Sequence, residues 1–135
     1  MCADVLYKRT DAGYSTVLRQ VVIQTVNWNT CHNINPYLVT PNVICAGMVA
    51  EGGKDSCYRD SGGPLVCKQG DRWFQYGIVN FGLHGLCGKP NIPAAYASVV
   101  AYQSWIREKS GGMHIIIIII ITDSIITRSM GQSQT

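Results

Sequence analysis

The sequence predicts an all-β domain, an antiparallel barrel or sandwich that is followed by one α-helix. Short predicted strands recur at regular spacing as far as Val99, and turn-forming segments separate them. Fourteen glycines and seven tyrosines are typical of a chain with many turns and half-buried strands. At 135 residues the chain is long enough to bury the core of one domain.

Residues 16–28 are rich in β-branched residues with imperfect alternation, which predicts a strand. Further strands are predicted over residues 43–48, 65–67, 73–79 and 94–99. The connections are turn-prone, and they cover residues 29–40 (with room for one short helical turn), 51–54, 69–72 and 82–93. Apolar side chains then recur close to one helical face, which predicts a helix over residues 99–109. These side chains are Val99, Tyr102, Trp105 and Ile106.

Six cysteines indicate the environment in which the protein folds. They are Cys2, Cys31, Cys45, Cys57, Cys67 and Cys87. The set is even and contains no CxxC pair, and the three histidines do not fall at zinc-finger spacing. We therefore expect disulfides in an oxidising compartment, and no metal site or cofactor. Spacing alone leaves the pairing of the cysteines open.

Charge and the N-terminal residues narrow the class of protein further. The net charge is +3, and the only dense basic run is Lys8–Arg9, so nucleic-acid binding is not expected. No apolar signal-peptide core follows Met1, although disulfides indicate a secreted protein. We therefore expect the chain to be a fragment that begins partway through a longer extracellular protein.

The composition changes sharply after residue 110. Seven consecutive isoleucines occupy residues 115–121, far fewer than the roughly 20 apolar residues that a membrane-spanning helix needs. The run is uncharged and β-prone, which is typical of an aggregation hazard rather than of a designed element. We expect a domain over residues 1–110 and a low-complexity tail over 111–135, disordered or artefactual, with no function and no membrane span.

The segment over residues 54–67 contains the residues that indicate chemistry. A serine acts as a nucleophile when a base takes its proton and donors stabilise the oxyanion that follows. Ser61 is followed by Gly62 and Gly63, which allow a tight turn and close approach of a substrate. The alternative interpretation is that Asp-Ser-Gly-Gly-Pro is only a favourable turn.

This segment resembles the active-site serine motif of the chymotrypsin/trypsin family, in which Gly-Asp-Ser-Gly-Gly-Pro-Leu lies between two cysteines. Further landmarks of that family follow in order along residues 2–109. They are Cys31, Cys45-Ala46-Gly47, the segment 77–82, Cys87, the segment 93–96, and Trp105-Ile106. The resemblance implies the C-terminal antiparallel β-barrel of the trypsin-like two-barrel fold, with a C-terminal α-helix.

The same resemblance implies the cysteine pairing and the roles of the serine segment. The implied disulfides are Cys31–Cys45, Cys57–Cys87 and Cys2–Cys67. Ser61 corresponds to the nucleophile, and its N–H and that of Arg59 correspond to the oxyanion hole. Asp60 corresponds to the carboxylate that pairs with the new α-amino group after zymogen cleavage.

The resemblance also implies a specificity pocket. Its residues are Asp55, Ser56, Asn80, Phe81, Gly82 and Ala94. Asp55 corresponds to the carboxylate at the base of the pocket, which favours a substrate Arg or Lys as its countercharge. Residues 80–82 correspond to the strand that binds the substrate main chain. From sequence alone, Asp55 is equally interpreted as a solvated turn residue beside Lys54.

Several positions depart from the family pattern. Arg59 and Ala94 each replace a glycine, Asn80 replaces a serine, and Phe81 replaces a tryptophan. If the backbone at Arg59 requires a positive φ, a non-glycine residue there costs about 1–3 kcal/mol. We expect the Arg59 side chain to crowd the leaving-group side of the cleft, and the Ala94 methyl to disfavour Arg more than a shorter side chain. The Gly-Trp-Gly often found after the first cysteine is missing from residues 5–9.

The triad's histidine and aspartate come from the N-terminal half of the family's domain. His32, His84 and His114 do not correspond to that base. We therefore expect a secreted serine endopeptidase of polypeptide substrates that is inactive without its N-terminal barrel, with exposed apolar surface where that barrel would lie. The alternatives are a non-catalytic pseudoprotease or binding module, and a disulfide-rich interaction domain that has no protease ancestry and another cysteine pairing.

Overall fold

A computed structural model of the chain describes residues 2–6, 9–10, 13–14, 19–82 and 87–111. The strands are β1 (Cys2–Leu6), β2 (Arg9–Thr10), β3 (Gly13–Tyr14), β4 (Arg19–Val26), β5 (Val43–Gly47), β6 (Pro64–Gln69), β7 (Arg72–Gly82) and β8 (Ala94–Ser98). The helices are α1 (Trp28–Ile34) and α2 (Gln103–Lys109). His84, His114 and the isoleucine run lie outside the described residues, so the expectations for them stay untested.

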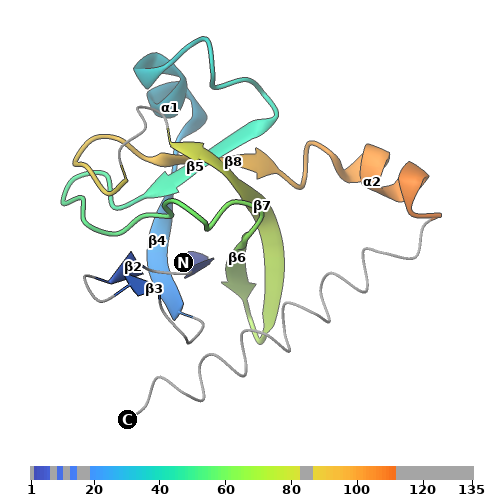
Figure 1. Ribbon diagram of the computed structural model, residues 1–135. Helices are drawn as coiled ribbons and strands as arrows, with labels where there is room; N and C mark the ends of the chain where they lie inside the picture. The colour runs from blue at the N-terminus through green and yellow to red at the C-terminus, as the bar shows by residue number, and fades with distance from the viewer. Residues whose placement is uncertain (1, 7–8, 11–12, 15–18, 83–86, 112–135) are drawn as a thin grey trace.

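Six of the strands form a closed antiparallel barrel in the order β1-β4-β5-β8-β7-β6 (Figure 1). Strand β1 pairs with β4 on one side and with β6 on the other, and this double pairing closes the barrel. The short strands β2 and β3 form a separate two-stranded sheet. The predicted all-β fold, with an antiparallel barrel and a C-terminal helix, is confirmed.

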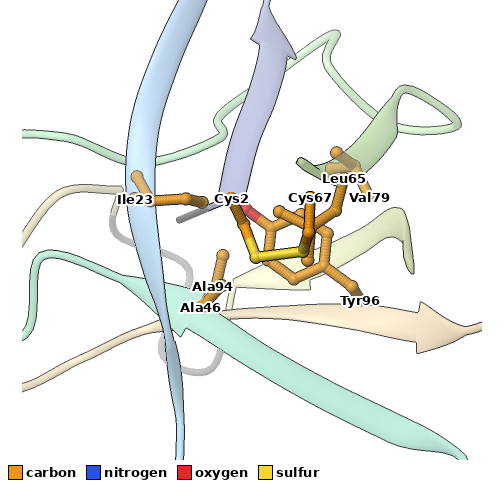
Figure 2. Close-up of a cluster of buried hydrophobic side chains, with 8 residues drawn as sticks. All are labelled: Cys2, Ile23, Ala46, Leu65, Cys67, Val79, Ala94 and Tyr96. Carbon is orange, nitrogen blue, oxygen red and sulfur yellow. A yellow bond between two sulfur atoms is a disulfide. The ribbon is translucent and has the colours of Figure 1, made fainter. Parts of the chain in front are cut away.

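One buried cluster fills the barrel (Figure 2). Its members are Cys2, Ile23, Ala46, Leu65, Cys67, Val79, Ala94 and Tyr96. Gly77 of β7 lies where the barrel is too narrow for a side chain, because a Cβ at this position would be 2.8 Å from Cβ of Tyr96. A glycine at this position therefore allows the fully buried Tyr96 ring to occupy the core.

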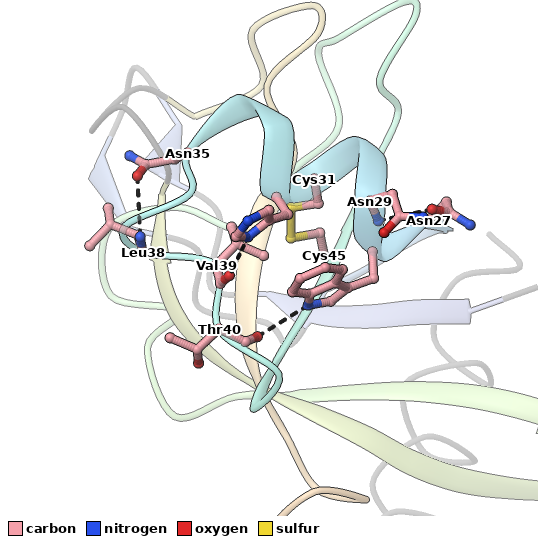
Figure 3. Close-up of a disulfide and its surroundings, with 10 residues drawn as sticks. Asn27, Asn29, Cys31, Asn35, Leu38, Val39, Thr40 and Cys45 are labelled. Carbon is pink, nitrogen blue, oxygen red and sulfur yellow. Dashed lines mark hydrogen bonds between the residues drawn. A yellow bond between two sulfur atoms is a disulfide. The ribbon is translucent and has the colours of Figure 1, made fainter.

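A second buried cluster lies beneath helix α1 and contains Cys31, Val39, Cys45 and Ala95. Figure 3 shows the Cys31–Cys45 disulfide, which joins α1 to β5. The Trp28 indole donates from Nε1 to the Thr40 carbonyl at 3.2 Å, and His32 Nδ1 lies 2.9 Å from the Val39 carbonyl oxygen. The two rings stack, with centroids 4.5 Å apart. A full two-turn helix therefore forms where the sequence predicts one short turn.

The C-terminal helix is shorter than predicted. The N–H of Val99 donates to the Tyr76 carbonyl at 2.9 Å, which continues the pairing of β8 with β7 past the end of the strand. The chain must then turn before a helix can begin, so α2 starts at Gln103 rather than at Val99. The predicted apolar face is largely exposed, since Trp105 is 59% exposed and Tyr102 is 41% exposed.

Helix α2 projects away from the barrel beyond the end of β8 (Figure 1). No residue of α2 is buried, and Val100 in the preceding turn is also exposed. The chain therefore has exposed apolar surface at this end. Neither described helix is long and apolar enough to cross a membrane.

Candidate active site

Ser61 lies in a tight turn between β5 and β6 that we call the serine turn, residues 57–63. Two reciprocal hydrogen bonds shape it: the Cys57 N–H donates to Oδ2 of Asp60 at 2.8 Å, and the Asp60 N–H donates to the Cys57 carbonyl at 3.0 Å. Asp60 is only 4% exposed, whereas Ser61 is exposed. The buried carboxylate thus anchors the turn and leaves the serine at the surface.

The serine turn is also bound to strand β7. The Gly62 N–H donates to the Val79 carbonyl and the Val79 N–H donates to the Gly63 carbonyl, both at 2.9 Å. A further bond joins the Gly63 N–H to the Asp60 carbonyl at 2.9 Å. Gly62 has a φ of +86°, a conformation that favours glycine. The backbone around Ser61 is therefore fixed on both sides by the fold.

Arg59 has a φ of +76°, in the left-handed region. The positive φ that the family's glycine suggested is therefore present, and an arginine adopts it. A non-glycine residue in this conformation costs about 1–2 kcal/mol. The exposed Arg59 side chain lies two residues from Ser61, on the side of the turn that precedes the serine. Backbone strain is thus located beside the candidate nucleophile.

Asp55 is half-buried, and its two carboxylate oxygens have different surroundings. Oδ2 accepts a hydrogen bond from the Gly88 N–H at 2.9 Å. Oδ1 is buried and has no hydrogen-bond partner among the described residues. Burial raises the pKa of this carboxyl above its ordinary value, the nearby Asp60 charge raises it further, and backbone N–H groups of Gly88 and Ser56 oppose the rise. The role of Asp55 in binding a cationic ligand stays a prediction.

Ser56 connects this acceptor to the barrel core. Its Oγ lies 3.1 Å from the hydroxyl of Tyr96, and both residues are buried. Tyr96 pairs with Val79 across β8 and β7, and Val79 is the residue that binds the serine turn. The register of these two strands thus brings Ser56 and the serine turn to the same end of the barrel.

Sequence reasoning missed two residues of this arrangement, Gly88 and Tyr96. Gly88 donates to Asp55 through its backbone and accepts from the Gly53 N–H through its carbonyl, at 2.6 Å. No side-chain pattern reveals such a backbone role. Gly52 lies against the same carbonyl, because a Cβ on it would be 2.7 Å from the Gly88 oxygen. A hydrogen bond of Tyr96 could have been expected from the sequence, because the hydroxyl of a buried tyrosine usually finds a hydrogen-bond partner.

The segment Asn80–Gly82 at the end of β7 has one paired side within the described residues. It pairs with β8, where the register shifts between Val79 and Phe81. On the opposite side of β7, the last residue with a described hydrogen-bond pairing is Val79, which binds the serine turn. Asn80 and Gly82 are exposed, while Phe81 packs against the second buried cluster. The role of this segment in binding a substrate main chain stays a prediction.

Ala94 lies in a different environment from the other pocket residues. It is 2% exposed and belongs to the cluster inside the barrel, where Figure 2 shows it close to Ala46. Whether it lines the pocket itself stays a prediction.

All three implied disulfides are present, and the Gly-Trp-Gly departure near residues 5–9 did not prevent the pairing of Cys2 with Cys67. The interpretation as a disulfide-rich domain with another cysteine pairing is therefore wrong. His32 is held in α1 by Trp28 and Val39. Among the residues that the structure describes, no group of three or more His, Cys, Asp or Glu side chains could hold a metal ion.

Comparisons with known proteins identify what the chain is similar to. The sequence profile of the family described as Trypsin matches residues 6–106. Over 106 residues the chain is 40% identical to a protein of Mus musculus described as transmembrane protease serine 11E. The matched region covers 76% of this chain and 24% of the mouse protein, so the chain spans a minor part of that relative's length.

Proposed function

Because the chain belongs to the trypsin family of serine proteases, we propose that it is the part of a serine endopeptidase that carries the nucleophile and the substrate pocket. The observation that carries this proposal is the serine turn, which leaves Ser61 exposed. Buried Asp60 closes the turn by hydrogen bonds with Cys57, and Gly62 and Gly63 bind it to β7. Residues 1–110 form the barrel domain of this enzyme. Residues 111–135 are a tail to which we assign no function.

In the proposed reaction, Ser61 Oγ attacks a peptide carbonyl and forms an acyl-enzyme that water then hydrolyses. From the likeness to the trypsin family, we assign the N–H groups of Arg59 and Ser61 to the oxyanion. We assign to Asp60 the role of pairing with the new α-amino group that zymogen cleavage creates.

Substrate choice follows from Asp55 in this proposal. Its buried Oδ1 has no described partner, and a substrate Arg or Lys supplies a positive charge and N–H donors for it. The substrate main chain pairs with the open edge at Asn80–Gly82. Together these contacts orient the peptide bond that follows the basic residue toward Ser61.

The base and its aspartate are assigned to an N-terminal barrel. His32 is engaged with Trp28 and the Val39 carbonyl, which leaves it unsuited to this role. The apolar surface around Tyr102 and Trp105 is the face that we assign to contact with that barrel. The 135-residue chain is accordingly inactive by itself. Three disulfides favour an extracellular site for the assembled enzyme.

Labelling with a fluorophosphonate probe tests this function. The 135-residue chain should show no labelling above a heat-denatured control. The same chain folded together with the N-terminal barrel of a trypsin-like protease should label, and Ser61→Ala should abolish that labelling. The assembled protein should also cleave peptides after Arg or Lys.

One rival function stays open because of the strained arginine at position 59. A pseudoprotease or binding module with the same fold would bind basic peptides at Asp55 without cleaving them. Such a protein would bind the peptides in the assembled form and remain unlabelled by the probe. That pair of results would replace the endopeptidase proposal with the rival.

A further inference from the structure

Two loops beside Asp55 are joined through their backbones, and each loop carries a lysine. The Gly53 N–H donates to the Gly88 carbonyl at 2.6 Å. Lys54 follows Gly53 directly, and Lys89 follows Gly88 directly. Because each lysine is next to one partner of this hydrogen bond, the two lysines lie close together in the fold. Both are exposed, and neither forms an ion pair within the described part of the chain.

Arg59 on the serine turn adds an exposed cation at the same end of the barrel. The disulfide between Cys57 and Cys87 joins this turn to the loop of Lys89, with Cα atoms 5.4 Å apart. Arg59 and Lys89 each lie two residues beyond one of these cysteines. The disulfide and the hydrogen bond between the loops therefore gather the three cations around the candidate pocket. We call Lys54, Arg59 and Lys89 the basic rim.

The carboxylates near the basic rim lie mostly beneath the surface. Asp60 is 4% exposed and accepts from the Cys57 N–H, and Asp55 is half-buried. Among the described residues of segments 48–63 and 87–93, the one exposed acid is Glu51. Exposed charges act on each other over about 10 Å at an ionic strength of about 0.1 M. The outer surface around the pocket therefore carries an excess of positive charge, which attracts anions.

This surface charge opposes the binding of a substrate whose only charge is its Arg or Lys. Asp55 attracts such a side chain, whereas the basic rim repels it. A substrate that carries acidic residues beside its basic residue removes the conflict, because its carboxylates face the rim while its cation faces Asp55.

We propose that the basic rim binds acidic side chains of the substrate, so that the enzyme selects peptides in which an Arg or Lys is flanked by Asp or Glu. The preference rests on the function proposed above, since it concerns the same pocket. Complementary charge of this kind contributes to specificity more than to affinity.

Peptide binding to the 135-residue chain tests the basic rim. Two peptides of equal length each contain one arginine, which glutamates flank on both sides in one peptide and glutamines in the other. The glutamate peptide should bind about three- to tenfold more tightly in about 0.05 M NaCl, since each exposed ion pair contributes a factor of at most about five. The preference should fall below about twofold in about 0.5 M NaCl, because salt screens exposed charges. Equal affinities at low salt would overturn the proposal.

Paired variants locate the preference on the surface. Lys54→Gln combined with Lys89→Gln should lower the preference for the glutamate peptide to about twofold or less. The matched control is Lys68→Gln combined with Arg72→Gln, which removes two exposed cations from the β6–β7 hairpin, at the end of β6 that lies away from the serine turn. The control has the same net charge and should keep the preference. Loss of the preference in both pairs would show that net charge alone attracts the peptide, and would overturn the proposal.

The cation p-aminobenzamidine separates this proposal from the proposed function. It has an amidinium group and no carboxylate, so its binding depends on Asp55 and not on anion capture by the rim. Its affinity should stay the same or rise in the variant with Lys54→Gln and Lys89→Gln, because two like charges are removed. If it binds while the two peptides bind equally, the preference is overturned and the pocket stands. If neither it nor the peptides bind, the proposed pocket is overturned, and the preference fails with it.

A sulfated oligosaccharide is the other anion that the basic rim could attract. Its binding is measured with the same two variant pairs. If it binds through Lys54 and Lys89 while the glutamate peptide shows no advantage over the glutamine peptide, the rim serves a polysaccharide. That result would overturn the preference for acidic substrates.

Discussion

The barrel and the loops at its end are stabilised in different ways. The barrel has six paired strands, a buried cluster around Tyr96, and a disulfide within that cluster. The serine turn and its neighbouring loops are held by single hydrogen bonds and an exposed disulfide. They also contain residues of positive φ, such as Arg59. Changes in the barrel should therefore alter stability, while changes in the loops should alter binding and catalysis. The predictions below test this division.

The largest expected effect is that of Asp55→Asn on the assembled enzyme. Loss of the charge removes one partner of a buried ion pair with the substrate, so kcat/KM for Arg or Lys peptides should fall about 100-fold or more. The free energy of unfolding of the chain should change little, because Asparagine keeps an acceptor for Gly88. Peptide kinetics and urea unfolding measure the two quantities. A large loss of stability with unchanged kinetics would contradict the division.

Gly77→Ala should have the opposite effects: it should lower the free energy of unfolding and leave kcat/KM little changed. The new methyl would lie 2.8 Å from Cβ of Tyr96, and overpacking of this kind typically costs about 1–3 kcal/mol of stability. Gly70→Asn is the matched control, since Gly70 has a φ of +59° that Asn tolerates and open space around it. Urea unfolding should show a large loss for the first variant and a small one for the second. Equal losses would show that the barrel is less tightly packed than the structure indicates.

Arg59→Gly tests the strained loop position. Relief of the positive φ should raise stability by about 1 kcal/mol at most, because glycine also has more freedom in the unfolded chain. In the assembled enzyme, kcat/KM for bulky substrates and the affinity of protein inhibitors should both rise. If both stay unchanged in the variant, Arg59 does not crowd the leaving-group side of the cleft.

The smallest expected effect is a pH dependence of stability due to Asp55. Its pKa in the folded chain is raised mainly by burial, so the folded state holds the proton more tightly than the unfolded state. The contribution of this group therefore destabilises the fold as pH rises from the ordinary value of 3.8 through the raised folded value. The stability of Asp55→Asn relative to the natural chain should increase over this window and then level off. A difference that is independent of pH would contradict the shift.

Sequence reasoning was most successful where a feature is local in the chain. Strands β5, β6 and β8 lie within a residue or two of their predicted positions, since turn-forming segments flank them. It was less successful for α2, whose first turn is lost because Val99 pairs with Tyr76, a residue distant in sequence. Similarly, α1 extends past the predicted turn because Trp28 and His32 bind carbonyl groups of the loop that follows.

By itself, the sequence determined the all-β class, the disulfide framework through its family resemblance, and the position of Ser61 in a tight glycine-rich turn. Only the tertiary structure decided which groups meet there. Gly88 reaches Asp55, and the Tyr96 hydroxyl reaches Ser56, because barrel closure and strand register bring distant segments together. Burial decided the rest: it leaves Oδ1 of Asp55 without a described partner, and it separates one exposed disulfide from two buried ones.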